Sequence, residues 1–261
     1  MSKRYPWYDS GWLELYVIAK DFIRRSHPEK LHDFVHAFDV FRTDPAFSIK
    51  KVAKPFDESI VSELKAITKK VDVTKAPDHE LSDFGRFVVY DEPYADKLQD
   101  DMTGLVSELV GEQVEPCYNF LSLYWEMGVC GVHMDAPFAK WTLDYCIEQS
   151  DVWPIHFSKI VPWPESGIET GEGWQDKIKS DPENKFESYE MQEGEALIFS
   201  GCSQWHYREP IERRNQSNFC NLLFFHYIPA GTSELTKPVN WKDLFDIPEL
   251  AGLENPTDYP L

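Results

Sequence analysis

The stretch "GVCGVHMDAPFAKWTLDYCIEQSDVWPIHF" (residues 128–157) decides the fold of this chain. It begins in a glycine-marked turn and places His133 and Asp135 two positions apart, before a segment rich in aromatic and β-branched residues. Side chains alternate between the two faces of a β-strand, so a His-x-Asp triplet directs both ligand groups to one side. The triplet predicts half of a metal site. Because it also arises by chance, a third ligand must be found elsewhere.

The third ligand is expected in "MQEGEALIFSGCSQWHYREP" (residues 191–210), where His206 follows a predicted strand that ends at Gly201. A sandwich of strands can bring together residues that lie this far apart along the chain. Two histidines and one carboxylate on one face of a metal leave positions open, which is the arrangement of non-haem iron(II) oxygenases. His133, Asp135 and His206 are therefore the predicted metal ligands and catalytic centre.

The order of the predicted elements indicates the fold class. Apolar residues recur at three- and four-residue spacing in "WLELYVIAKDFIRR" (12–25) and "DESIVSELKAITKKV" (57–71), which predicts amphipathic helices. From about residue 84, short segments rich in aromatic and β-branched residues alternate with Gly, Pro, Asn and Ser, which predicts strands. One more helix is expected to end at Gly111. We expect an α+β, mainly β protein: an antiparallel sandwich or barrel with helices packed outside.

The chain is expected to form a single domain over residues 1–261. Its parts are a helical segment at 1–83, a sheet core at 84–230 and a C-terminal tail at 231–261. A polar insertion at about 162–185, marked by Gly and Pro, interrupts the core. Two interpretations stay open: a lid whose Trp163 and Trp174 close over a substrate, or a disordered surface loop.

Composition excludes several classes of function. A net charge of −19 disfavours DNA or RNA as partners, because a phosphate backbone needs a basic surface. No apolar run approaches the roughly 20 residues of a membrane span, and no secretory apolar segment begins the chain, so we expect a cytoplasmic protein. The 5 cysteines are scattered without a Cys-x-x-Cys motif. They are expected to be reduced thiols, since this pattern does not suit a thiolate zinc site or a disulfide framework.

Three segments resemble one enzyme family: "LSLYWEMGVCGVHMD" (121–135), "GEALIFSGCSQWHYREP" (194–210) and the closing strand "NLLFFHYIP" (221–229). They are similar to the Fe(II)- and 2-oxoglutarate-dependent oxygenases, and most of all to the small prolyl-hydroxylase-like enzymes. The resemblance covers about residues 84–230. It implies a double-stranded β-helix core (a cupin-like jelly roll), with Fe(II), 2-oxoglutarate and O2 as cofactor and co-substrates. The implied reaction is hydroxylation of an unactivated C–H bond.

The resemblance also implies a basic residue that pairs with the distal carboxylate of 2-oxoglutarate. Many relatives carry it on the closing strand, where this chain has Gln216 and Ser217 instead. Three arginines remain as candidates: Arg208, Arg213 and Arg214. Arg208 is preferred because a His-x-Arg motif can place it on the face of His206, and Arg214 is second. Arg213 and Arg214 otherwise belong to a solvated loop.

Further residues are expected to line the site. Asn119, Tyr124 and Ser217 are candidates for hydrogen bonds to 2-oxoglutarate. Arg86, Asn221 and Glu126 are candidates for substrate contacts. Arg86 alternatively forms a structural salt bridge, and Asn221 is expected to face the cavity from the closing strand. His226, on the same apolar strand, is expected to be a hydrogen-bonded core histidine.

The expected substrate is a small molecule, either a free amino acid or a natural-product intermediate, and neither nucleic acid nor membrane is expected as a partner. Desaturation or cyclisation by the same centre is an alternative outcome. A halogenase is disfavoured, because such relatives lack the carboxylate that Asp135 supplies. A function other than catalysis is also an open alternative: the chain could be a cupin-like protein that binds a metal or ligand without catalysis.

Overall fold

The computed structural model describes residues 3–4, 10–72, 74, 78–90, 92–126, 128–163, 168–169, 173–212 and 218–252. Two antiparallel sheets form its centre. The strands of the six-stranded sheet are, in spatial order, β2 (Lys50–Ala53), β10 (Glu195–Ser200), β6 (Trp141–Gln149), β12 (Cys220–Pro229), β4 (Val114–Tyr124) and β3 (Arg86–Tyr90). Those of the four-stranded sheet are β5 (Cys130–His133), β11 (His206–Arg208), β7 (Ile155–Phe157) and β9 (Glu187–Tyr189). A small ribbon pairs β1 (Lys3–Arg4) with β8 (Ile168–Glu169).

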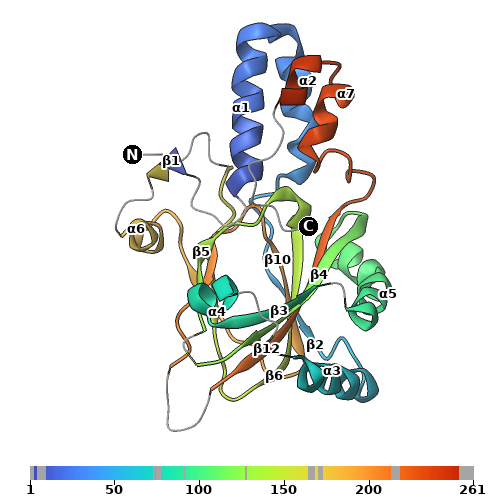
Figure 1. Cartoon of the computed structure of the whole chain (residues 1–261), viewed down its shortest axis with the longest axis vertical. Coiled ribbons are helices and arrows are strands. Elements are labelled where there is room, and N and C mark those ends of the chain that lie inside the picture. The colour runs from blue at the N-terminus through green and yellow to red at the C-terminus, as the bar shows by residue number, and fades with distance from the viewer. Residues whose placement is uncertain are drawn as a thin grey trace.

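Helices surround these sheets. The α-helices are α1 (Ser10–Ser26), α2 (Leu31–Ala37), α3 (Glu58–Lys70), α4 (Asp78–Phe84), α5 (Pro93–Val110), α6 (Trp174–Ser180) and α7 (Trp241–Leu244). Short 3-10 helices are η1 (Pro28–Lys30), η2 (Asp39–Phe41), η4 (Pro137–Ala139), η5 (Pro238–Asn240) and η6 (Pro248–Gly252). Figure 1 shows α1, α2 and α7 together at one end, and α3 and α5 beside the six-stranded sheet. No helix in the described part of the chain is long and apolar enough to cross a membrane.

Local chemistry explains where α5 begins and ends. The Glu92 side chain accepts hydrogen bonds from the backbone N–H groups of Tyr94 and Ala95, and Pro93 occupies the first turn, where its missing N–H costs nothing. Gly111 ends the helix with φ 76°, a left-handed conformation that glycine adopts without a steric penalty. The helix end predicted at Gly111 is confirmed.

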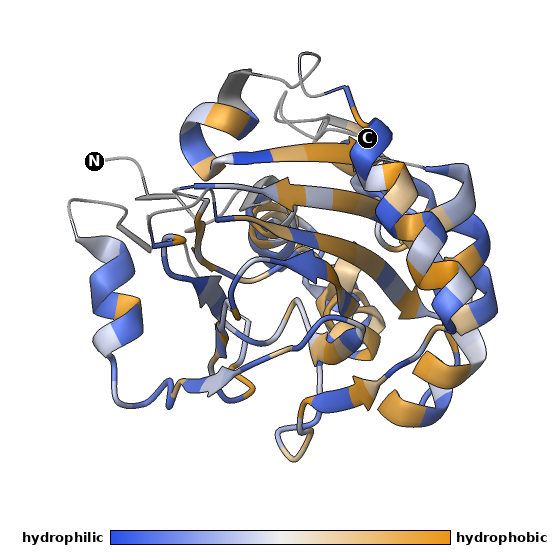
Figure 2. Ribbon diagram, turned by 90° about the horizontal axis from the view of Figure 1, so that it is seen from below, coloured by the Kyte–Doolittle hydropathy of each residue, from blue (hydrophilic) through white to orange (hydrophobic). Residues whose placement is uncertain are grey.

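The six-stranded sheet is buried on both faces along its central strand β6. Trp141, Leu143 and Tyr145 pack on one side with residues of α3 and α5, such as Leu64 and Val106. The intervening Thr142, Asp144 and Cys146 turn to the other side, as period-two alternation requires. Figure 2 shows the apolar residues concentrated along the strands and on the helix sides that cover them.

The two sheets pack face to face through a shared cluster. Leu197 and Phe199 of β10 and Leu222 of β12 meet Ile155 and Phe157 of β7 there, and all of these side chains are buried. The four-stranded sheet therefore covers the β10 side of its larger neighbour. It also carries His133 at the end of β5 and His206 at the start of β11, which are paired in register.

A helical cap closes one end of the molecule; we use this name for α1, α2 and α7 with their shared core. Trp12 of α1 packs edge-on against Phe38 and Trp241, and the three rings are fully buried. The cap core also contains Ala136 and Cys202, which lie in the loops that follow β5 and β10.

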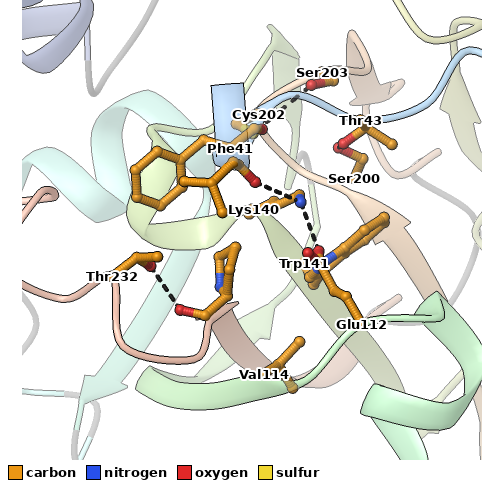
Figure 3. Close-up of polar contacts among 12 residues, drawn as sticks. Phe41, Thr43, Glu112, Val114, Lys140, Trp141, Ser200, Cys202, Ser203 and Thr232 are labelled. Atoms are coloured by element: carbon orange, nitrogen blue, oxygen red, sulfur yellow. Dashed lines mark hydrogen bonds and ion pairs between the residues drawn. The ribbon is translucent and has the colours of Figure 1, made fainter. Parts of the chain in front are cut away.

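Polar contacts tie the cap to those loops (Figure 3). The Cys202 thiol donates to the Phe41 carbonyl over 3.2 Å. Lys140 Nζ, just before β6, donates to the Val40 carbonyl over 2.7 Å. The cap therefore braces the segment that follows Asp135.

The predicted α+β class is confirmed, since antiparallel sheets are combined with helices that lie mostly early in the chain. Strand β2 was not expected, because it lies inside the predicted helical segment. The described part of the insertion at 162–185 is not a structureless loop, since it contains α6 and β8. Trp163 is buried in the cap core against Trp12, and Trp174 packs beside Val132 on the four-stranded sheet. A lid role for this insertion stays a prediction.

Candidate metal centre

The structure brings together the three predicted ligands, His133, Asp135 and His206. Their ligand atoms all lie within 4.8 Å of one another. Asp135 Oδ1 is 3.7 Å from His133 Nε2 and 3.9 Å from His206 Nε2. The side chains are 20%, 12% and 5% exposed, respectively. Two imidazole nitrogens and one carboxylate oxygen thus converge on one point at the edge of the four-stranded sheet.

Backbone carbonyls fix the orientation of both imidazoles. His133 Nδ1 lies 2.6 Å from the Gly131 carbonyl, and His206 Nδ1 lies 3.0 Å from the Gln204 carbonyl. A carbonyl only accepts, so each Nδ1 carries the proton and each Nε2 lone pair faces Asp135. Each imidazole is therefore oriented by a backbone carbonyl that lies two positions before it in the chain.

Both imidazoles are held neutral, which is the form that binds metals. Burial lowers the pKa of His133 well below its usual range, and electrostatic interaction with His206 and Arg86 lowers it further. Burial lowers the pKa of His206 to about 4. At neutral pH both rings therefore keep an unprotonated nitrogen for a cation.

The Asp135 carboxylate is positioned by the strands on the other side. Its backbone N–H donates to the Gly201 carbonyl over 2.8 Å, and Thr142 Oγ1 donates to Asp135 Oδ2 over 3.3 Å. Gly201 leaves room for this carboxylate: a Cβ at position 201 would collide with Asp135 Oδ2 and with the Ala139 carbonyl. Only glycine therefore fits at position 201, just after β10, without displacing the Asp135 carboxylate.

Arg208, the preferred partner for 2-oxoglutarate, points between the sheets. Its Nη2 lies 2.6 Å from Asp144 Oδ2 on β6, and its Nη1 donates to the Trp153 carbonyl. The guanidinium also lies 4.9 Å from the centre of the Trp153 ring. Arg208 and Asp144 are both buried, and burial raises the pKa of the Asp144 carboxyl. Arg208, which is predicted to pair with 2-oxoglutarate, is thus already paired with the Asp144 carboxylate.

Arg86 and Tyr124 form a second buried group close to the triad. Arg86 Nε lies 2.7 Å from Glu80 Oε2, and Arg86 Nη1 donates to the Tyr124 hydroxyl over 3.0 Å. Burial raises the pKa of Tyr124 to about 12, so its hydroxyl keeps its proton. Of the two interpretations of Arg86, the salt bridge is present, while a contact with substrate stays a prediction.

Two asparagines face away from the triad, contrary to expectation. Asn119 Nδ2 donates to Asp96 Oδ1 and Gln99 Oε1 of α5, on the outer side of β4. Asn221 precedes Leu222, whose side chain lies between the sheets, and shares its parity with Leu223 on the helix side. The predictions that Asn119 contacts 2-oxoglutarate and that Asn221 faces the cavity are therefore corrected.

Of the remaining candidates, the structure describes only Glu126. Glu126 occupies the turn that follows β4, and its side chain is half-buried. Arg214 and Ser217, with Arg213, fall outside the described residues.

Sequence reasoning missed Thr142, Asp144 and Gly201. A signal existed for Asp144, because an aspartate inside the apolar strand "WTLDYCI" (141–147) must be paired if it is buried. Thr142 and Gly201 carry no comparable signal, since both residue types are common where strands begin and end.

No protein-family model matches this chain, and no curated protein sequence matches it. Solved structures do match it. AviO1 from Streptomyces viridochromogenes Tue57 is 12% identical with a TM-score of 0.50, and the match covers 76% of this chain and 95% of that one. HygX from Streptomyces hygroscopicus, with nickel, 2-oxoglutarate and hygromycin B bound, is 11% identical with a TM-score of 0.50 over 76% and 86% of the two chains.

The epimerase SnoN, in complex with Fe3+, alpha-ketoglutarate and nogalamycin RO, is 12% identical. Its TM-score is 0.51, and the match covers 76% of this chain and 88% of that one. Structural matches at identities this low establish the fold and not the function. The chain has the fold of these proteins, among them enzymes that bind iron and 2-oxoglutarate, and the resemblance seen in the sequence is confirmed at that level.

Proposed function

We propose that this chain is an Fe(II)- and 2-oxoglutarate-dependent dioxygenase that hydroxylates an unactivated C–H bond of a small molecule. The convergence of His133, Asp135 and His206 within 4.8 Å carries this proposal. Two neutral imidazoles and one carboxylate suit a divalent iron and leave positions open for co-substrates. The fold match to enzymes solved with iron or nickel and 2-oxoglutarate supports it.

The strand arrangement supports a double-stranded β-helix. Four strands of the large sheet (β10, β6, β12 and β4) are neighbours in that order, and β5, β11, β7 and β9 form the facing sheet. A jelly roll has eight strands in two facing sheets. We also infer a single domain over residues 1–261, because the helical cap shares its core with Ala136 and Ile228 of the sheet region.

The residues present fit the implied groups. His133 Nε2, His206 Nε2 and an Asp135 oxygen would hold the iron. We assign the distal carboxylate of 2-oxoglutarate to Arg208, with Arg214 second, and a hydrogen bond to the Tyr124 hydroxyl. Arg86 and Glu126 remain candidates for substrate contacts.

When bound, iron and 2-oxoglutarate supply the oxidising power: 2-oxoglutarate and O2 become succinate and CO2, and one oxygen atom enters the substrate C–H bond. The protein's part is orientation and exclusion of water. Thr142 and Gly201 keep the Asp135 carboxylate aimed at the two imidazoles. The backbone carbonyls of Gly131 and Gln204 keep each Nε2 unprotonated toward the site.

Anaerobic titration tests this proposal. Metal-free protein receives Fe(II) and then 2-oxoglutarate, and the expected result is the weak visible charge-transfer band of the chelate. Admission of O2 with candidate substrates should then yield succinate. Asp135→Ala should abolish the band while the fold is kept, whereas Asp33→Ala, on the exposed side of α2, should keep it. Iron binding without any turnover of 2-oxoglutarate would favour a non-catalytic metal-binding protein.

A further inference from the structure

Two histidines lie one helical turn apart on α2 of the helical cap. The segment "HDFVH" (residues 32–36) places His32 and His36 at i and i+4, where the side chains of a helix are neighbours. Phe34, midway between them in the sequence, points inward and is buried in the cap core. The two imidazoles therefore share the outer face of α2, where they are 85% and 73% exposed.

The two imidazole rings lie beside one hollow in the surface. Their centroids are 5.8 Å apart, and their planes are inclined by 29°. His32 and His36 line an open hollow of about 420 Å³ together with Asp39 and apolar side chains of α2. Because both histidines are exposed, rotation about their side-chain bonds brings the two rings toward a common point in this hollow. The hollow has room for an ion and for its water ligands.

A carboxylate holds the Nδ1 atom of each ring. His36 Nδ1 lies 2.9 Å from Asp39 Oδ2, and His32 Nδ1 lies 3.3 Å from Asp33 Oδ1. A carboxylate only accepts, so in each neutral ring Nδ1 carries the proton and Nε2 keeps its lone pair. Arg42 Nε, 3.2 Å from Asp39 Oδ1, fixes the Asp39 carboxylate in turn. Imidazoles backed by carboxylates in this way are typical metal ligands.

The donor set of this pair favours zinc. An H-x3-H spacing on one face of a helix is typical of zinc ligands, and imidazole nitrogen suits zinc, whereas calcium and magnesium take oxygen ligands. Among the described residues, only the triad brings three ligand groups within 4.8 Å. The site on α2 therefore supplies two protein ligands, and water completes the tetrahedral shell of the ion.

We propose that His32 and His36 bind a zinc ion, which acts as a structural clip on α2. This site is separate from the triad, and the proposal goes beyond the proposed function. α2 has 7 residues, fewer than the roughly 12–15 that an isolated helix needs for stability in water. An ion bound at i and i+4 links successive turns of α2, so it holds Phe34 in the cap core.

Zinc titration of a protein without the triad site tests the proposal. The background is the full chain with His133→Ala and Asp135→Ala, which leaves His206 as the single imidazole of the triad. Calorimetric titration with zinc chloride alone should show one site per chain. In this background Asp39→Ala should weaken zinc binding about tenfold, the low end of the effect of losing a carboxylate behind a ligand. His36→Ala should weaken it further, because a ligand itself is lost.

His27→Ala is the matched control. His27 follows α1 on the same cap, but Glu249 lies 3.4 Å from its Nε2 and Glu29 lies 3.9 Å from its Nδ1, so it does not share the pairing of His32 and His36. Zinc affinity should be unchanged in this variant. In the wild type, zinc stoichiometry should fall from two to one in His36→Ala. This second measurement does not depend on folding of the background, and the exposed His36 can be replaced without opening the core.

Urea denaturation tests the structural role. A ion that binds only the folded protein stabilises it, so saturating zinc should raise the urea midpoint of the background protein and leave that of its His36→Ala variant unchanged. Equal zinc affinity in the background and in its His36→Ala variant would overturn the proposal. Zinc binding with no rise in the midpoint would overturn the role of the ion as a clip. Neither measurement needs 2-oxoglutarate or iron, so both are independent of the proposed function.

Discussion

Arg208 and Asp144 form an ion pair inside the sandwich: Nη2 lies 2.6 Å from Oδ2, and the side chains are 3% and 0% exposed. The pair joins β11 of the small sheet to β6 of the large one. Removing one partner of such a pair leaves an uncompensated charge in the interior, whereas replacing both by apolar residues is often neutral. The pair therefore makes each residue costly to change alone.

A double-mutant cycle measures this coupling. Asp144→Leu and Arg208→Met should each lower the free energy of unfolding by about 3–5 kcal/mol, because each leaves one charge buried and unpaired. The double variant should be far closer to the wild type than the sum of the two changes. Urea denaturation of the metal-free protein gives all four values. Simple additivity would mean that the two charges do not interact.

The double variant also isolates the role of Arg208 in co-substrate binding, because it removes the guanidinium without leaving a buried charge. Its affinity for 2-oxoglutarate, measured with Fe(II) under anaerobic conditions, should fall roughly 10- to 150-fold, the effect of losing a charged hydrogen-bonded partner. Arg214→Met should change the affinity much less. The reverse ranking would assign the clamp to Arg214.

Gly201→Ala should weaken metal binding through a steric clash. The new Cβ would meet Asp135 Oδ2 and the Ala139 carbonyl, so the carboxylate must move away from the two imidazoles. We expect Fe(II) affinity to fall at least tenfold, which is the usual scale for disturbing what supports a metal ligand. Gly104→Ala is the matched control: its Cβ would meet nothing within 4 Å, and it lies inside α5, where alanine favours the helix. Equal iron affinity in both variants would contradict this prediction.

His226 should make stability depend on pH. Burial lowers its pKa from 6.5 to about 3 in the folded protein, so below pH 6.5 the unfolded chain takes up a proton that the folded protein does not. The free energy of unfolding should fall as pH decreases from 6.5 toward 3, by up to about 1.4 kcal/mol per pH unit for this residue. His226→Phe should show a shallower decline in urea denaturation at pH 7, 6, 5 and 4. Identical slopes would show that this ring titrates normally.

The sequence predicted the metal triad better than its surroundings, and the reason is geometric. Period-two alternation predicts that His133 and Asp135 share a face, and the predicted strand that ends at Gly201 locates His206 just after it. The same alternation does not say which face of a strand points inward. β4 and β12 carry apolar side chains on both faces, toward α5 and toward the opposite sheet, so no polar face distinguishes the two sides for Asn119 or Asn221.

The insertion at 162–185 shows a second limit. Its Gly and Pro residues indicated a loop, but Trp163 is held by Trp12, more than a hundred positions earlier in the sequence. A contact between such distant residues leaves no local pattern. The same holds for the helical cap, whose parts come from both ends of the described chain.

The helical cap has a consequence for synthesis on the ribosome. Trp12 Nε1 donates to the Thr236 carbonyl, and Lys30 Nζ donates to the Phe245 carbonyl. These two hydrogen bonds can form only after the C-terminal acceptor residues have been synthesised. Until the segment around Trp241 emerges, the apolar side of α1 has no partner from α7. A nascent chain of this protein therefore carries an uncovered aromatic surface for most of its translation. A stop codon before residue 235 would make that exposure permanent.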